Sequence, residues 1–154
     1  MLVSMKILMV CLGNICRSPL AQGILEQKIK EQGLDWEVDS AGTGSWHIGE
    51  QPDPRSVFTA GQHGLDITSQ RARQFRRQDL KDFDLILAMD QSNYRDILRL
   101  AQSPAEEEKV KKILDYASDG DGGNVPDPYW DDDGFEKVYQ MLDQACDALI
   151  GAHR

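Results

Sequence analysis

Two short runs of consecutive apolar residues interrupt a chain whose apolar positions otherwise recur with helical spacing. They occupy residues 6–10 and 84–89. Runs of this length with almost no polar position are typical of strands buried on both faces of a sheet. A second strand is predicted at residues 36–40, and a shorter fourth strand at residues 110–114.

Helical spacing follows the predicted strands, and turn residues mark the helix ends. Leu20, Ala21, Ile24, Leu25 and Ile29 recur three and four positions apart until Gly33, which predicts the end of that helix. Gly64 is expected to end the next one in the same way. The predicted N-cap residues are Ser18, Asp53, Ser92 and Asp133. Pro19 and Pro54 follow two of these caps, as expected in a first turn, and Asp133 with Glu136 has the form of a capping box.

Strands alternating with helices over short connections indicate an α/β fold with a parallel sheet covered by helices on both faces, three αβα layers in all. Ligands of such sheets bind beyond the carboxyl ends of the strands, where the segment after residue 10 lies. No linker divides the chain, so residues 1–154 are expected to form one domain. A loop rich in Gly, Asp and Pro is predicted at residues 118–133.

The composition indicates which classes of binding partner and which cellular compartment to expect. A net charge of −9 disfavours nucleic acid and anionic membranes. No apolar run approaches the ~20 residues that span a bilayer, and no secretory leader is visible, so a cytoplasmic protein is expected, with leaderless export left open. Three cysteines are an odd number, which suits a reducing compartment and at least one reactive thiol. Too few Cys and His residues have ligand spacing for a metal site.

The segment Cys11-Leu12-Gly13-Asn14-Ile15-Cys16-Arg17-Ser18-Pro19 has the features of a phosphate receptor. Backbone N–H groups in a tight loop before a helix bind anions, and the helix dipole adds positive potential. Gly13 would permit unusual backbone conformations, and Asn14 tolerates left-handed geometry. Arg17 offers a planar fork for two phosphate oxygens.

Cys11 would lie at the centre of this positive loop, where the thiolate form is favoured, with Ser18 placed to donate to the sulfur. Attack of the sulfur on a phosphoryl group would leave a phosphocysteine that water hydrolyses. The alternative without a catalytic role is that Cys11 is an ordinary buried cysteine and Arg17 a surface arginine. That alternative explains neither Gly13-Asn14 nor Ser18-Pro19.

Residues 11–19 resemble the signature of the low-molecular-weight protein tyrosine phosphatases. Further matches follow in order at Asp39-Ser40-Ala41-Gly42-Thr43, Arg71-Ala72-Arg73-Gln74, Met89-Asp90-Gln91-Ser92-Asn93 and Val125-Pro126-Asp127-Pro128-Tyr129. The resemblance covers nearly the whole chain. It implies a four-stranded parallel sheet with flanking helices, a phosphotyrosine-containing protein as substrate, phosphate or other oxyanions as ligands of the loop, and no cofactor.

A general acid is also needed, because Cys11 cannot protonate the leaving oxygen. Asp127 lies between Pro126 and Pro128, which restrict the backbone on both sides. A doubly negative substrate nearby would favour its protonated form, and the resemblance implies the same role. On local sequence alone, a turn residue in an Asp-Pro loop is an equal alternative.

Trp46, Tyr129 and Trp130 are expected to form the walls of the substrate cleft, where aromatic rings would select phosphotyrosine over phosphoserine. Ordinary half-buried aromatic residues are the alternative. Trp130 replaces the tyrosine that is commoner in the family. Ile15 stands where related protein-arginine phosphatases tend to carry threonine, which favours a tyrosine-type substrate.

Predictions are also made for four other positions. Cys16 is implied by the resemblance to be a redox partner of Cys11, with a small buried side chain as the alternative. Cys146 lies on the apolar stripe of the last helix and is predicted to be core. Gln70 replaces a histidine that orders the loop in many eukaryotic relatives, and Asp90 is expected to pair with His47, His63 or a loop donor.

Three alternative functions remain to be weighed. A protein-arginine phosphatase shares the fold and much of the loop. A thiol-coupled arsenate reductase would need further cysteines, and none lies between Cys16 and Cys146. A non-catalytic phosphotyrosine-binding module would be expected to lose Cys11 or Asp127, and the chain keeps both.

Overall fold

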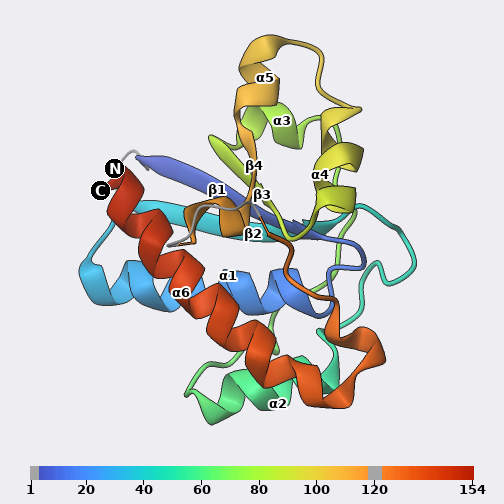
Figure 1. The fold of residues 1–154 in the computed structure, drawn as a ribbon, viewed down its shortest axis with the longest axis vertical. Coiled ribbons are helices and arrows are strands. Elements are labelled where there is room, and N and C mark those ends of the chain that lie inside the picture. Colours follow the sequence, from blue (N-terminus) through green and yellow to red (C-terminus); the bar gives the residue numbers. More distant parts are fainter. Residues whose placement is uncertain (1–3, 118–122) are drawn as a thin grey trace.

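A four-stranded parallel sheet forms the centre of the molecule in a computed structural model that describes residues 4–117 and 123–154 (Figure 1). Its strands are β1 (Met5–Cys11), β2 (Trp36–Gly42), β3 (Leu85–Ala88) and β4 (Val110–Lys112), in the order β2-β1-β3-β4. All three strand pairs are parallel. The predicted parallel sheet with helices on both faces is confirmed.

Six α-helices are described, and they lie on both sides of the sheet, with α2 packed on α1 and α6 (Figure 1). The helices on one side are α1 (Arg17–Gln32), α2 (Pro54–Gln62) and α6 (Phe135–His153), and those on the other are α3 (Asp79–Asp82), α4 (Gln91–Leu98) and α5 (Pro104–Glu108). Three short 3-10 turns, η1 (Ile113–Tyr116), η2 (Pro128–Trp130) and η3 (Asp132–Gly134), complete the chain. The sequence pattern did not predict α3 or α5, because four or five residues are too short to show helical periodicity.

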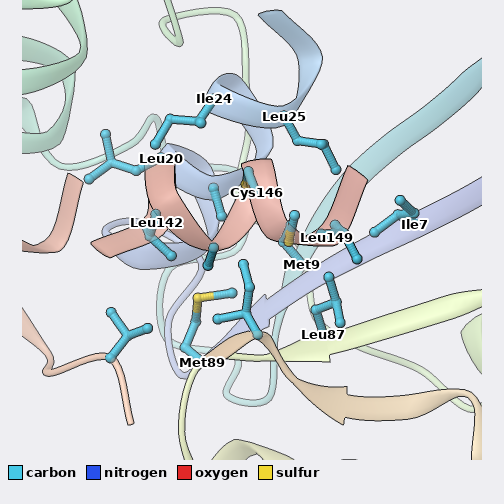
Figure 2. Packing of buried hydrophobic residues seen from close by; sticks show 14 of the residues in the cluster. Ile7, Met9, Leu20, Ile24, Leu25, Leu87, Met89, Leu142, Cys146 and Leu149 are labelled. Carbon is cyan, nitrogen blue, oxygen red and sulfur yellow. The ribbon is translucent and has the colours of Figure 1, made fainter. Parts of the chain in front are cut away.

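The core has two parts because side chains alternate across the central strand. Ile7 and Met9 of β1 point toward α1 and α6, where Figure 2 shows them near Leu25 and Leu149. Leu8 belongs instead to the cluster on the opposite face. A strand buried on both faces holds its ends firmly, so the loop that leaves the carboxyl end of β1 starts from a fixed point.

The predicted helix ends are partly right. Gly33 adopts the left-handed conformation (φ 64°) after α1, and Asp53 caps α2 through the N–H of Arg55. Gly64, also left-handed with φ 79°, follows the end of α2.

The other three N-cap predictions were wrong. Cys16 precedes α1 without a side-chain cap, because the Ser18 hydroxyl is bonded to Cys11. Asp90 rather than Ser92 caps α4 by accepting from the N–H of Asn93. The capping box of Asp133 and Glu136 is absent, since Asp133 belongs to η3 and Gly134 precedes α6.

The predicted loop at residues 118–133 falls partly outside the described residues, which omit 118–122. Its remainder contains η2 and most of η3. Within the part of the chain that the structure describes, no helix is long and apolar enough to cross a membrane.

Candidate active site

The loop between β1 and α1 lies at the carboxyl end of the sheet, as expected, and forms the floor of a cavity of about 350 Å³. We call residues 11–18 the phosphate loop. Every predicted site residue except Asn14 and Ser18, which lie beneath the loop, lines this cavity. The lining residues are Cys11, Leu12, Gly13, Ile15, Cys16, Arg17, Trp46, His47, Asp127, Tyr129 and Trp130.

The sulfur of Cys11 is held by two contacts from its own loop. The Ser18 hydroxyl lies 3.0 Å from Sγ, and the backbone N–H of Asn14 donates to Sγ at 3.3 Å. Only 2% of Cys11 is exposed. Two polar groups thus contact one sulfur close to the start of a sixteen-residue helix, and the residue also lines the cavity.

Asn14 organises the loop from below. Its backbone is left-handed (φ 58°), and its side-chain amide donates to Ser18 Oγ at 2.7 Å and to Ser40 Oγ at 3.0 Å. Ser40 in turn donates to Gln22 at 2.6 Å. Because Ser18 Oγ accepts from Asn14, its own hydrogen is available for the sulfur of Cys11.

The guanidinium of Arg17 is buried and fixed in orientation. Its Nη1 donates to Asp90 Oδ2 at 2.7 Å and to the carbonyl of Val125 at 3.0 Å. Burial alone would lower the pKa of Arg17, but the neighbouring Cys11 and Asp90 outweigh it and raise that pKa above its ordinary value. Arg17 therefore stays charged and keeps its plane beside the sulfur, a geometry suited to phosphate oxygens.

Asp127 lies above Arg17 on the segment between β4 and α6. One carboxylate oxygen accepts from the N–H of Tyr129 at 3.0 Å, and the other lies 3.7 Å from Arg17 Nη2. Its side chain is one-third exposed and faces the cavity. A carboxyl group in this position can exchange a proton with a ligand held by the phosphate loop.

The aromatic residues form the mouth of the cavity rather than its depth. Trp46 is 70% exposed, Tyr129 38% and Trp130 85%. The rings of Tyr129 and Trp130 meet edge to face with centroids 4.9 Å apart. His47 also lines the cavity and bonds to Glu50 at 2.9 Å, a position that the sequence pattern did not single out.

Each of the four motifs beyond the phosphate loop reaches that loop or its arginine. Ser40 and the N–H of Arg73 both bond to the Asn14 side chain, the latter at 3.0 Å. Asp90 and the carbonyl of Val125 hold Arg17. Motifs spread over the chain thus converge on one site.

Four details differ from expectation or refine it. Of the three partners expected for Asp90, the structure shows the loop donor, which is Arg17, and neither histidine. Gly13 has no left-handed backbone, but a Cβ there would lie 3.1 Å from a carbon of His47. Gly42 lies against the backbone of the phosphate loop, since a Cβ there would lie 2.8 Å from the Leu12 carbonyl oxygen. Gln70, in place of the family's histidine, donates to the carbonyl of Pro19 at 3.1 Å.

The two remaining thiols are buried and free. Burial, followed by the charges of Asp53 and Cys11, raises the pKa of Cys16 to about 12. Cys146 lies in the core between α1 and α6, as predicted (Figure 2). Among residues 4–117 and 123–154, no group of three or more His, Cys, Asp or Glu side chains could hold a metal ion.

Comparisons with known proteins agree with this geometry. The family model described as low molecular weight phosphotyrosine protein phosphatase matches residues 6–153. A Synechocystis protein named as a candidate low molecular weight protein-tyrosine-phosphatase is 48% identical over 151 residues, which cover 95% of this chain and 94% of that protein. A protein tyrosine phosphatase from Entamoeba histolytica has a crystal structure with a TM-score of 0.91 at 37% identity, covering 97% of both chains. The crystal structure of a Drosophila arginine phosphatase gives a TM-score of 0.90 at 35% identity, covering 97% of this chain and 98% of that one.

Proposed function

Because the chain belongs to the low molecular weight protein-tyrosine-phosphatase family and is a phosphatase enzyme, we propose that it hydrolyses phosphotyrosine in proteins through a phosphocysteine on Cys11. The observation that carries this proposal is the position of one sulfur, one guanidinium and one carboxyl group around a single cavity. We propose Cys11 as the nucleophile, Arg17 as the phosphate-binding residue and Asp127 as the general acid.

The first step forms the phosphocysteine. The phosphate loop and Arg17 bind the phosphoryl oxygens, and the thiolate of Cys11 attacks phosphorus in line with the leaving oxygen. The S–P bond forms as the bond between phosphorus and the tyrosine oxygen breaks. The hydroxyl of Ser18 stabilises the thiolate before attack and, in the second step, the thiolate that leaves.

Asp127 moves the proton in both steps. It gives its proton to the departing tyrosine oxygen, so that tyrosine leaves as a neutral phenol. Its carboxylate then takes a proton from the water that attacks the phosphocysteine. The S–P bond breaks, and inorganic phosphate leaves the loop. The chemistry is complete with side chains of this chain, so we propose no cofactor.

Phosphotyrosine fits the cavity better than shorter phosphoamino acids. The sulfur is buried at the floor while Trp46 and Tyr129 stand at the mouth, so the phosphate must be carried on a long, flat group. Phosphoarginine is the second candidate, because the likeness to the Drosophila arginine phosphatase extends over 97% of the chain. The apolar Ile15 in the cavity wall favours the uncharged aromatic ring over a guanidinium group.

We further propose that Cys16 protects the nucleophile. If a peroxide oxidises Cys11 to a sulfenic acid, the Cys16 thiol can attack that sulfur, which forms the Cys11–Cys16 disulfide and releases water. Thiol reductants would restore both groups. Such a cycle suits a reducing cytoplasm, where we place the protein. With a net charge of −9, we expect neither nucleic acid nor anionic membrane as a partner.

The test uses matched phosphotyrosine, phosphoserine and phosphoarginine peptides with the full chain in reducing buffer. We expect turnover of phosphotyrosine, loss of turnover in Cys11→Ser, and a decrease of about 100-fold or more in kcat/KM in Asp127→Ala. The pH profile should be bell-shaped, and Asp127→Asn should lack its alkaline limb. No turnover by the wild type would refute the proposal, and faster turnover of phosphoarginine would shift it to the second candidate.

A further inference from the structure

Arg55 links the segment that carries Asp127 to the phosphate loop. It lies in the first turn of α2, and Nη1 donates to the carbonyl of Tyr129 at 3.1 Å and to the carboxylate of Asp132. Its guanidinium lies 4.7 Å from the centre of the Phe135 ring and 5.5 Å from that of Tyr129. One side chain therefore holds the segment through a backbone atom, a carboxylate and two rings.

The other end of this link is Asp53. Arg55 donates to its carboxylate through Nε at 3.0 Å and Nη2 at 2.9 Å, a two-point contact with a side chain that is only 9% exposed. These hydrogen bonds lower the pKa of Asp53. The backbone N–H of Asp53 donates to the carbonyl of Ile15 at 2.8 Å. Arg55 is thus tied, through one residue, to the loop that holds Cys11.

The segment around Asp127 has few other connections to the loop. It begins at Val125, whose N–H is bonded to the carbonyl of Met89 at 2.8 Å and whose own carbonyl accepts from Arg17. After that point, the hydrogen bond from Tyr129 to Asp127 is local. The contact between Asp127 and Arg17, at 3.7 Å, must yield when phosphate oxygens occupy the guanidinium. The contact of Arg55 with Tyr129 does not involve the ligand site and can persist.

On the basis of the proposed function, we propose that Arg55 is a positioning residue that holds Asp127 at the leaving oxygen of the substrate. A general acid acts only within about 2.6–3.2 Å of the atom that it protonates. The carbonyl that Arg55 holds is two residues beyond Asp127, on the short turn η2. Loss of this contact would leave the acid on a mostly exposed segment that is held by its buried residues, Val125 and Pro128, and by the buried start of α6.

This role makes the effect of Arg55 depend on the leaving group. Phenyl phosphate releases a basic phenolate that needs the proton of Asp127, whereas p-nitrophenyl phosphate releases a stabilised anion that needs it much less. The measured quantity is kcat/KM, which reports the steps up to formation of the phosphocysteine. We expect Arg55→Met to lower kcat/KM about tenfold for phenyl phosphate and less than about threefold for p-nitrophenyl phosphate.

A second variant and a double mutant separate positioning from folding. Arg55→Lys keeps a charge beside Asp53 but not the planar fork, and should give an intermediate loss with the same dependence on the leaving group. In the Asp127→Ala background, Arg55→Met should change kcat/KM for phenyl phosphate less than about twofold, because no acid remains to be positioned. Arg99→Met, an equal change at an exposed arginine on the far side of the sheet, is the matched control.

Equal losses with both substrates, or a tenfold loss that persists without Asp127, would overturn the proposal and assign Arg55 to the structure of the phosphate loop. Either result would leave turnover dependent on Cys11 intact. Failure of the proposed function would look different, because the wild type itself would then show no turnover that Cys11→Ser abolishes.

Discussion

The two halves of the site are built in opposite ways. The phosphate loop is buried except at Leu12 and Gly13, and hydrogen bonds from its own residues and from β2 hold it in place; Asn14 and Arg17 are 3% and 2% exposed. The segment that carries Asp127, residues 125–134, is mostly exposed after its buried first residue and consists of two short turns. Arg55, at the start of α2, is its main link to the phosphate loop after that first residue.

The difference follows from what each half does. The nucleophile must meet phosphorus in one fixed geometry, and buried hydrogen bonds are stronger and less mobile than exposed ones. The acid must move a proton to a substrate that enters and leaves past it, so its segment lies at the mouth. We therefore expect substitutions in the phosphate loop to change stability and activity together, and substitutions in the outer segment to change activity with little cost in stability.

The largest effect is expected from Asn14→Ala. This change removes three side-chain hydrogen bonds and leaves a non-glycine residue at φ 58° without the local bonds that favour it. We expect a loss of about 2–3 kcal/mol in the free energy of unfolding. The activity, measured as kcat/KM, should fall about 100-fold with good and poor leaving groups alike.

Asn14→Gly is the matched control, because glycine adopts the same backbone without strain but makes none of the side-chain bonds. If the hydrogen bonds position the loop, Asn14→Gly should regain part of the stability that Asn14→Ala loses, but little of the activity. Urea unfolding and kcat/KM for phosphotyrosine give the two readouts. Full activity in both variants would contradict the view that Asn14 orients Ser18 toward the sulfur.

The fold could be predicted because its signals are local. Buried strands are continuous apolar runs, and helices of two turns or more show periodicity, so the layers of the sheet follow from the sequence. Helix starts were less predictable, since several polar residues compete for each cap. Ser18 has the chemistry of an N-cap, yet its hydroxyl is used by Cys11. The sequence predicted both the cap and the contact with Cys11 for this one hydroxyl, and spacing alone does not decide between them.

The sequence predicts that Cys11, Arg17 and Asp127 share one site, and all three line the same cavity. Cys11 and Arg17 lie in one motif, whereas Asp127 was predicted from its flanking prolines together with the family resemblance. The supporting contacts were predicted only in part, because Asp90 was expected to pair with a histidine or a loop donor and Arg55 was not singled out. Asp90 pairs with Arg17 across 73 positions of sequence, and Arg55 reaches Tyr129 across 74. Such pairs are created by the packing of β3 and α2 against the loop, and spacing along the chain does not show which residues will meet.

A smaller effect is expected from the second thiol of the phosphate loop, and it depends on pH. The pKa of Cys16 is raised from its ordinary 9.0 to about 12, first by burial. The folded state therefore favours the neutral thiol, and this stabilisation is complete below pH 9 and is lost as the pH rises toward 12. When the pH rises from 8 to 10, the free energy of unfolding of the wild type should fall by about 1.4 kcal/mol more than that of Cys16→Ala.

Cys146→Ala provides the comparison, because burial also raises the pKa of Cys146 to about 12, far from the cavity. Both variants should show a flatter pH dependence of the free energy of unfolding, measured with urea. An unchanged dependence in Cys16→Ala would mean that the thiol ionises as readily in the folded chain as in the unfolded one, and that this part of the phosphate loop is less well buried than the structure indicates.

The smallest effect is expected at the outer edge of the acid segment. Trp130 is 85% exposed, so Trp130→Ala should change the free energy of unfolding by no more than about 0.5 kcal/mol. If its ring contacts the substrate, KM for a phosphotyrosine peptide should rise about two- to fivefold, the range expected for one aromatic contact, while kcat stays constant. Trp130→Phe should restore most of the affinity. A loss of stability as large as that of Asn14→Ala would contradict the proposed difference between the two halves of the site. An exposed side chain that only contacts the substrate should not stabilise the fold.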